Sequence, residues 1–154
     1  MKMSDDDLKN FPKLAEYVRV NIPEVMNVPK IVKNLKKHSS LTTAELRHAL
    51  AWGNLPLIVV KDLSNFQCIV QAAYGCFVPA TPDQIELDTG EAKEFETDRY
   101  GAGSDRTSDG RKVFIVGTTL LHELCHWGNF KKGVAEVKEQ GIAFEVATYG
   151  RITG

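Results

Sequence analysis

Apolar residues recur at helical spacing through residues 4–40, and prolines divide the pattern into short pieces. Pro12 and Pro29 each stand where a helix can begin, and Pro23 interrupts the chain between them. The helix after Pro29 ends in the basic run KNLKKH, which suits the negative end of a helix dipole. This run is most simply a solvated face, so we expect His38 to be exposed.

The next helix has the clearest start signal in the chain. Thr42 and Glu45 fit a capping box, which predicts a helix over residues 43–52 that stops at Gly53. His48 lies on this helix, and no local residue pairs with it. A structural or surface role is therefore favoured for His48 over a role in a site.

Four stretches of β-branched or alternating residues predict strands. They are residues 55–63, 66–77, 85–87 and 113–116. Residues 89–112 are polar and turn-rich, which predicts a long loop, with a further short strand as an option at residues 94–96. The acidic residues of this loop are most simply solvent-facing: Glu91, Glu94, Glu96 and Asp98.

Residues 118–129, TTLLHELCHWGN, form the most informative helical stretch. Their apolar side chains make two stripes, Leu120, Leu124 and Trp127 in one and Leu121 and Cys125 in the other. Only the sector of His122, Glu123 and His126 is polar. A helix that is apolar on most sides is buried, and a buried glutamate needs a partner. Cys125 lies off the histidine stripe and is expected in the core.

The polar sector is an HExxH pattern, and its spacing suits a zinc ion. His122 and His126 lie about 40° apart around the helix and one turn apart along it, so both imidazoles can bind one Zn²⁺. Glu123 projects beside them, where it can take a proton from a water that the ion activates. The alternative is a chance match, with two core histidines whose hydrogen bonds are satisfied.

A catalytic zinc site needs a third protein ligand, and a second helix supplies candidates. Residues 134–149 predict a helix that Gly150 ends. Its carboxylates are Glu136, Glu139 and Glu145. The first two have polar or charged neighbours at helical spacing and look solvated, whereas Glu145 has no basic partner there. We therefore predict Glu145 as the third ligand.

Two further residues bear on this arrangement. Gly141 costs about 1 kcal/mol relative to Ala in a helix interior, and its small size would let this helix approach the zinc helix closely. Residue 132 is Lys, so the extended HExxHxxGxxH pattern is absent, which argues against a metzincin.

Composition narrows the class of protein. The chain has 154 residues, so one domain spanning residues 1–154 is expected. Its net charge of −1 gives no positive electrostatic field that would attract nucleic acid or an anionic membrane. No apolar run reaches the ~18 residues of a membrane span, and the acidic start is not a signal peptide. Three cysteines do not make a disulfide framework, although a Cys68–Cys76 bridge could form.

The motifs of the second half of the chain resemble a known family. The matching segments are HELCHWG at residues 122–128, EQG at 139–141, FE at 144–145 and YG at 149–150. In this order they resemble the toxin-type zinc metallopeptidase domains of bacterial secretion effectors, such as the C-terminal domains of type VI VgrG spike proteins. The resemblance is strongest over residues 117–150 and extends weakly back through residues 52–87.

This resemblance implies a fold, a ligand set and partners. The fold would be α+β, a minimal gluzincin-like zincin domain with a small mixed sheet packed on the HExxH helix and extra N-terminal helices. His122, His126 and Glu145 would bind Zn²⁺, and Glu123 would be catalytic. An immunity protein and a secretion-spike protein are candidate partners, and the protein would be a secreted effector that acts in a target cell, in the periplasm or in a host.

The predicted reaction is hydrolysis of peptide bonds in a peptide or protein substrate. The substrate would lie extended along an edge strand near residues 71–77. Tyr149, Tyr74 and Tyr100 are candidates for the donor that stabilises the oxyanion, and Tyr149 lies one turn after Glu145. Two alternatives remain: a zinc-bearing binding module without peptidase activity, and a metal-dependent amidase that acts on cell-wall peptides.

Overall fold

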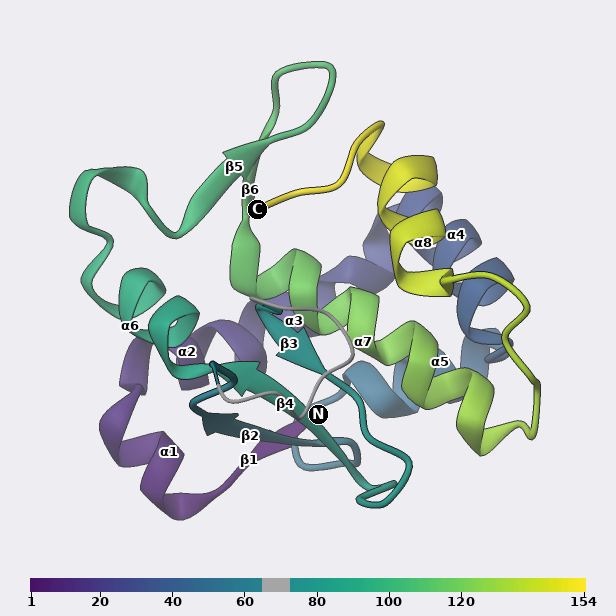
Figure 1. Cartoon of the computed structure of the whole chain (residues 1–154), viewed down its shortest axis with the longest axis horizontal. Helices are drawn as coiled ribbons and strands as arrows, with labels where there is room; N and C mark the ends of the chain where they lie inside the picture. Colours follow the sequence, from purple (N-terminus) through teal and green to yellow (C-terminus); the bar gives the residue numbers. More distant parts are fainter. Residues whose placement is uncertain (65–72) are drawn as a thin grey trace.

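The computed structural model describes residues 1–64 and 73–154, which form a mixed fold of helices around a small sheet (Figure 1). The helices are α1 Asp5–Asn10, α2 Pro12–Glu16, η1 Tyr17–Asn21, α3 Ile22–Glu24, η2 Val25–Asn27, α4 Pro29–Ser39, α5 Thr43–Leu50, α6 Thr89–Thr97, η3 Arg99–Gly101, α7 Ile115–Lys131 and α8 Gln140–Tyr149. The strands are β1 Lys2–Met3, β2 Leu57–Lys61, β3 Gly75–Cys76, β4 Gln84–Asp88, β5 Ser104–Arg106 and β6 Lys112–Phe114. The α+β prediction is confirmed.

The larger sheet has the strand order β1-β2-β4-β3. β1, β2 and β4 are parallel, and β3 pairs antiparallel with β4. Ile58, Ile85 and Leu87 point from this sheet into the hydrophobic core, where all three are fully buried. Of the strand predicted over residues 66–77, only β3 falls within the described part. Cys76 is disulfide-bonded, and Cys68, the partner that the sequence allows, lies outside the described residues.

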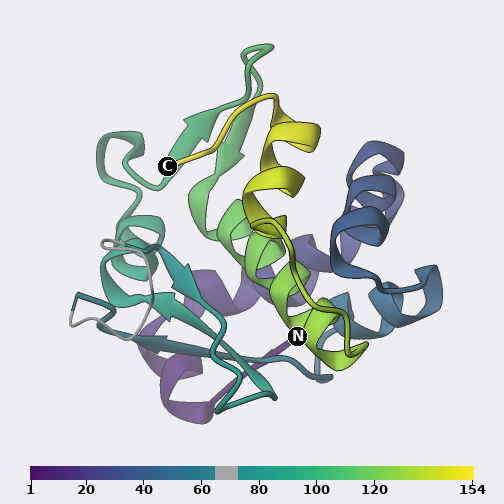
Figure 2. The same ribbon diagram turned by 45° about the vertical axis from the view of Figure 1, so that its right-hand side comes forward.

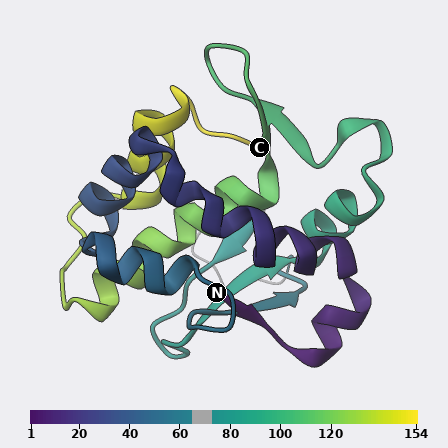
Figure 3. The ribbon, with the colours of Figure 1, turned by 180° about the vertical axis from the view of Figure 1, so that it is seen from behind.

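Helix α7 is the centre of the fold. It contacts the sheet through β4 and β3 and contacts α4 and α8 on its other side. Figure 2 shows α8 and α4 beside it, and Figure 3, which views the molecule from behind, shows the N-terminal helices crossing in front of it. The predicted buried helix is confirmed, since Leu120, Leu124 and Cys125 are fully buried. It begins at Ile115, so the strand predicted at residues 113–116 ends earlier, at Phe114.

The capping box predicted for α5 is present, because Thr42 accepts from the Glu45 backbone N–H and Glu45 accepts from the Thr42 backbone N–H. The expectation that His38 is exposed is wrong. The side chain is 8% exposed, and its Nδ1 lies 2.9 Å from Gln140 Oε1. This contact arises because α8 packs on α4, which a pattern confined to α4 does not show.

The predicted loop at residues 89–112 contains regular structure. Asp88 caps α6, which covers the residues considered for a short strand, and β5 pairs with β6 in a hairpin. The expectation of solvent-facing acids is wrong for Glu91, which is 7% exposed. Glu96 accepts hydrogen bonds from the backbone N–H groups of Lys13 and Leu14 at the start of α2, at 2.8 and 3.1 Å. Because these residues form the helix α6, Glu96 reaches the start of α2. None of the described helices is both long and apolar enough to cross a membrane.

Candidate metal centre

The two histidines of α7 project from one face of the helix, with ring centroids 5.2 Å apart. Their Nε2 atoms converge on one carboxylate oxygen, Glu139 Oε1, at 3.0 Å from His122 and 2.6 Å from His126. Among the described residues, these three side chains are the group that could hold a metal ion. The helix spacing of four residues is what places both rings at the same point.

Each ring is also held on its far nitrogen by a second carboxylate. His122 Nδ1 lies 2.6 Å from Glu145 Oε1, and His126 Nδ1 lies 2.8 Å from Glu136 Oε2. A histidine that donates from Nδ1 to a carboxylate presents the lone pair of Nε2 to a metal, with its ring orientation fixed. The four contacts therefore hold both rings in the orientation that a shared ion requires.

Glu136 is itself positioned by the end of α4. Asn129 donates from Nδ2 to Glu136 Oε1 at 2.8 Å and to the His38 carbonyl at 2.7 Å. Ser40 donates from its hydroxyl to Asn129 Oδ1 at 2.6 Å. Asn129 is buried, so this chain of contacts ties the carboxylate behind His126 to a neighbouring helix.

Of the residues predicted for the site, the structure brings His122, Glu123 and His126 together on α7, and it places Glu145 differently. Glu145 is buried against Nδ1 of His122, whereas the oxygen that faces both Nε2 atoms belongs to Glu139. Glu139 is exposed, as the sequence predicts, with 39% of its side chain accessible, but it also faces both rings, which a single helix over residues 134–149 does not predict. The helix begins instead at Gln140, and Glu139 is its N-cap, with its side chain accepting from the Ile142 backbone N–H.

A signal for this arrangement is present in the sequence at Gly141. A Cβ on this residue would lie 2.1 Å from Cδ2 and 2.2 Å from Nε2 of His122. The close approach expected at Gly141 is therefore confirmed. The first turn of α8 therefore packs directly against the His122 ring, and Glu145, further along the same helix, reaches Nδ1 of that ring.

Glu123 lies beside the histidines but is largely covered, with 7% of the residue exposed. Its Oε1 is 3.9 Å from His122 Nε2. Burial raises the pKa of Glu123 above its usual range, against the opposing charges of His122 and His126 and a hydrogen bond from the Phe77 backbone. A carboxylate with a raised pKa accepts a proton more readily near neutral pH, as a general base must.

The pKa values of His122 and Glu139 show how strongly the rings and the carboxylates interact. Burial acts to lower the pKa of His122, but hydrogen bonds to Glu139 and Glu145 and the charges of Glu123 and Glu139 outweigh it and raise the pKa to about 10. Burial acts to raise the pKa of Glu139, but hydrogen bonds from His122 and His126 outweigh it and hold that pKa far below the usual range.

The centre is rich in negative charge. Its acidic members are Glu123, Glu136, Glu139 and Glu145. Within the described part of the chain, the ion pairs of these carboxylates are with the two histidines and not with Lys or Arg. Four carboxylates around two imidazoles leave an excess of negative charge, which is costly at a partly buried site, and a divalent cation is the kind of group that balances it.

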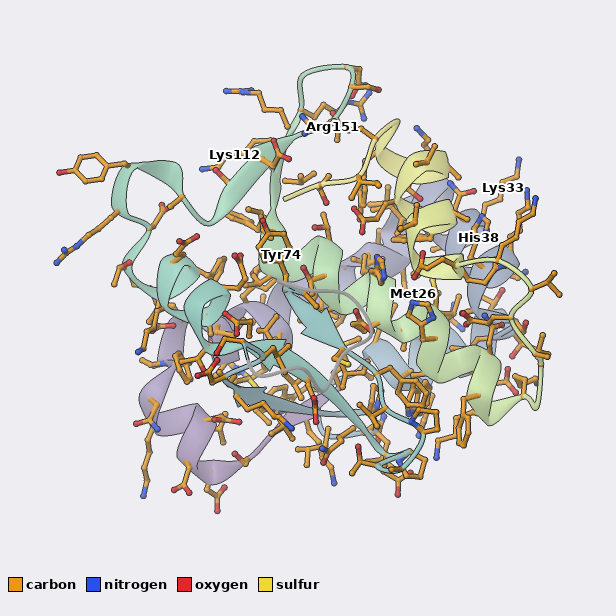
Figure 4. The ribbon with its side chains drawn as sticks, viewed as in Figure 1. Met26, Lys33, His38, Tyr74, Lys112 and Arg151 are labelled. Carbon is orange, nitrogen blue, oxygen red and sulfur yellow. The ribbon has the colours of Figure 1, made fainter. Side chains whose placement is uncertain are left out.

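The tyrosines considered as oxyanion donors lie in three different environments. Tyr149 is buried with its ring edge-on to Phe144 at 5.8 Å, and burial raises its pKa. Tyr100 projects fully into solvent from η3. Tyr74, labelled in Figure 4, is partly exposed and immediately precedes β3.

The chain matches a known protein family. The family model described as metallopeptidase toxin 3 matches residues 7–150, which is nearly the whole chain. No curated protein and no solved structure matches.

Proposed function

The chain belongs to the metallopeptidase toxin 3 family, and on that premise we propose that it is a zinc-dependent peptidase that acts as a secreted bacterial toxin. The observation that carries the proposal is the convergence of His122 Nε2, His126 Nε2 and Glu139 Oε1 on one point. The family implies a metal and a peptide or protein substrate. The identity of the metal and the site residues are our proposal.

The donor set suits zinc better than the other common protein metals. Two imidazole nitrogens and one carboxylate oxygen form the set of three protein ligands found in catalytic zinc sites, which keep a further position open. Calcium and magnesium favour sites made of oxygen ligands alone. The carboxylates behind the two Nδ1 atoms are the outer partners that such histidines usually have.

We propose Glu139 as the third ligand, with Glu145 and Glu136 orienting the rings from behind. The sequence-based choice of Glu145 remains the alternative. It would require this carboxylate to leave the Nδ1 side of His122, where its Oε1 lies at 2.6 Å. Glu139→Gln and Glu145→Gln distinguish the two assignments, because loss of a direct ligand lowers zinc affinity more than loss of an outer partner.

Bound zinc would polarise the scissile carbonyl and lower the pKa of the attacking water. Glu123 is the base that takes the proton of that water and returns it to the leaving amine. Its raised pKa suits both steps, since the group must accept a proton and then release it. His122 and His126 would hold the ion through their Nε2 atoms, and the carboxylates on Nδ1 keep each ring from rotating.

The substrate is proposed to pass beside β3. A Cβ on Gly75 would lie 3.1 Å from Glu123 Cγ, and the Phe77 backbone donates a hydrogen bond to the Glu123 carboxylate. These contacts place this segment next to the base. The first residues of the predicted substrate strand, 71 and 72, lie outside the described part of the chain. Tyr149 as oxyanion donor stays a prediction, which Tyr149→Phe tests by removing only the hydroxyl.

The proposed location is an oxidising compartment of a target cell, such as the periplasm. The disulfide at Cys76 supports this, since disulfides persist in such compartments and are rare in the cytosol. An immunity protein and a secretion-spike protein are the partners proposed for a toxin of this kind.

The test combines metal analysis with hydrolysis of casein or gelatin, with and without a chelator. Glu123→Gln should abolish hydrolysis and keep one equivalent of zinc, and His122→Ala should lose both. An active Glu123→Gln protein would overturn the mechanism. Tightly held zinc without hydrolysis of proteins or of cell-wall peptides would favour a binding module, and hydrolysis of the cell-wall peptides alone would favour an amidase.

A further inference from the structure

The segment that follows α8 turns back toward α7 and places one buried side chain against Glu145, the carboxylate behind His122. Thr153 is 4% exposed. Its backbone N–H donates to Glu145 Oε2 at 2.7 Å, and its hydroxyl lies 2.9 Å from the same oxygen. The hydroxyl also lies 2.7 Å from the hydroxyl of Thr118, which belongs to α7.

These contacts divide the two oxygens of Glu145 between two tasks. Oε1 lies on His122 Nδ1, and Oε2 is held by Thr153. A carboxylate with one contact can rotate about its terminal bond, whereas one held on both oxygens loses a hydrogen bond on either side when it turns. Thr118 lies one helical turn before His122, so the network begins and ends on α7.

The hairpin of β5 and β6 keeps this segment in place. Asp105 Oδ2 accepts from the Gly154 backbone N–H at 3.0 Å and lies 3.4 Å from Arg151 Nη2. Ser108 donates from its backbone N–H to the Tyr149 carbonyl at 2.8 Å. Figure 1 shows the end of the chain running from α8 to this hairpin, and Figure 4 labels Arg151 beside it.

We propose that Thr153 is a positioning residue for the metal centre, which acts on His122 through Glu145. Residues 151–154 then belong to the site and are not merely a tail on the surface. The proposal rests on the proposed function only where it concerns zinc. The orientation of His122 in the metal-free protein is a separate consequence.

Thr153→Val tests the proposal, because it replaces the hydroxyl with a methyl group of similar size. Thr148→Val is the matched control. Thr148 lies on α8 and is 6% exposed, and its hydroxyl has no hydrogen-bond partner among the described residues. Thr153→Ser, which keeps the hydroxyl, should restore the wild-type behaviour.

The first measurement is the His122 Nδ1 proton in NMR spectra of the metal-free protein. Its resonance should shift upfield and its exchange with solvent should become faster in Thr153→Val, and neither should change in Thr148→Val. The second measurement is zinc affinity by competition with a chromophoric chelator. Thr153→Val should weaken zinc binding about tenfold, the lower end of the effect of outer-shell partners.

Two results would overturn the proposal. One is a His122 Nδ1 signal that is unchanged in Thr153→Val. The other is a change of equal size in both valine variants, which would point to general loosening of α8. If the wild-type protein binds no zinc, the proposed function fails, and the NMR comparison still decides whether Thr153 positions His122.

Discussion

Gly141→Ala gives the most direct test of how α8 meets the histidines. The added methyl carbon would lie 2.1 Å from His122 Cδ2 and 2.5 Å from Cγ. Non-bonded carbons rest at about 3.5–4.0 Å, so the ring or the helix must move by roughly 1.4 Å. Metal–ligand distances tolerate about 0.2 Å, so His122 cannot keep its place in the coordination sphere.

The expected magnitude follows from losing one of the proposed ligands. We expect zinc affinity to fall by at least about 100-fold, which corresponds to ~2.8 kcal/mol. The free energy of unfolding of the metal-free protein should change by much less than this ~2.8 kcal/mol loss in zinc binding, because Ala favours a helix over Gly by about 1 kcal/mol and offsets part of the strain. Chelator competition and thermal unfolding with and without zinc measure the two effects separately.

Gly90→Ala is the control for this prediction. It is the same substitution in another helix, α6, and its added Cβ would meet only the side chain of Asp88. Zinc affinity should stay at the wild-type value. If Gly141→Ala also binds zinc within about threefold of wild type, the arrangement of α8 against His122 described here is wrong.

Three further predictions concern single side chains. Glu139→Gln should weaken zinc binding by more than tenfold and more than Glu145→Gln, as measured by chelator competition; the opposite order would restore Glu145 as the ligand. Hydrogen bonds to carboxylates raise the pKa of His122 to about 10 against the effect of burial. Zinc binding at pH 7 should therefore release a proton from this ring, and zinc affinity should rise as the pH rises toward 10. Calorimetry in buffers of different ionisation enthalpy measures the proton release, and a binding reaction that releases no proton would contradict the prediction. Burial, with the charges of Glu94 and Asp88, raises the pKa of Glu91 to about 7, so the folded protein loses stability as the pH rises from 4.5 through 7. At pH 8, Glu91→Gln should raise the melting temperature by a few °C, which corresponds to about 1 kcal/mol in the free energy of unfolding. This gain should vanish near pH 4.5.

Local patterns were enough to predict the core of the site. His122, Glu123 and His126 share one face because of the helical repeat, which depends only on their spacing. The apolar residues around them predicted that this helix is buried, and the structure confirms it. The start of α5 at Thr42 and the end of α8 at Gly150 were likewise readable, because caps depend on a few adjacent residues.

The roles of the acidic residues depended on packing between elements. Glu139 and Glu145 are six residues apart, and which of them faces the Nε2 atoms depends on where α8 begins and how it lies against α7. His38 is buried for the same reason, through its contact with Gln140 of α8.

The sequence by itself therefore determined that the two histidines and the neighbouring Glu123 share one face of a buried helix, since this follows from spacing within that helix. Only the tertiary structure decided which carboxylate faces the two Nε2 atoms, which ones hold the rings from behind, and that Thr153 reaches Glu145. Those assignments are set by the docking of α8 and residues 151–154 on α7, and docking is a long-range property that no local pattern contains.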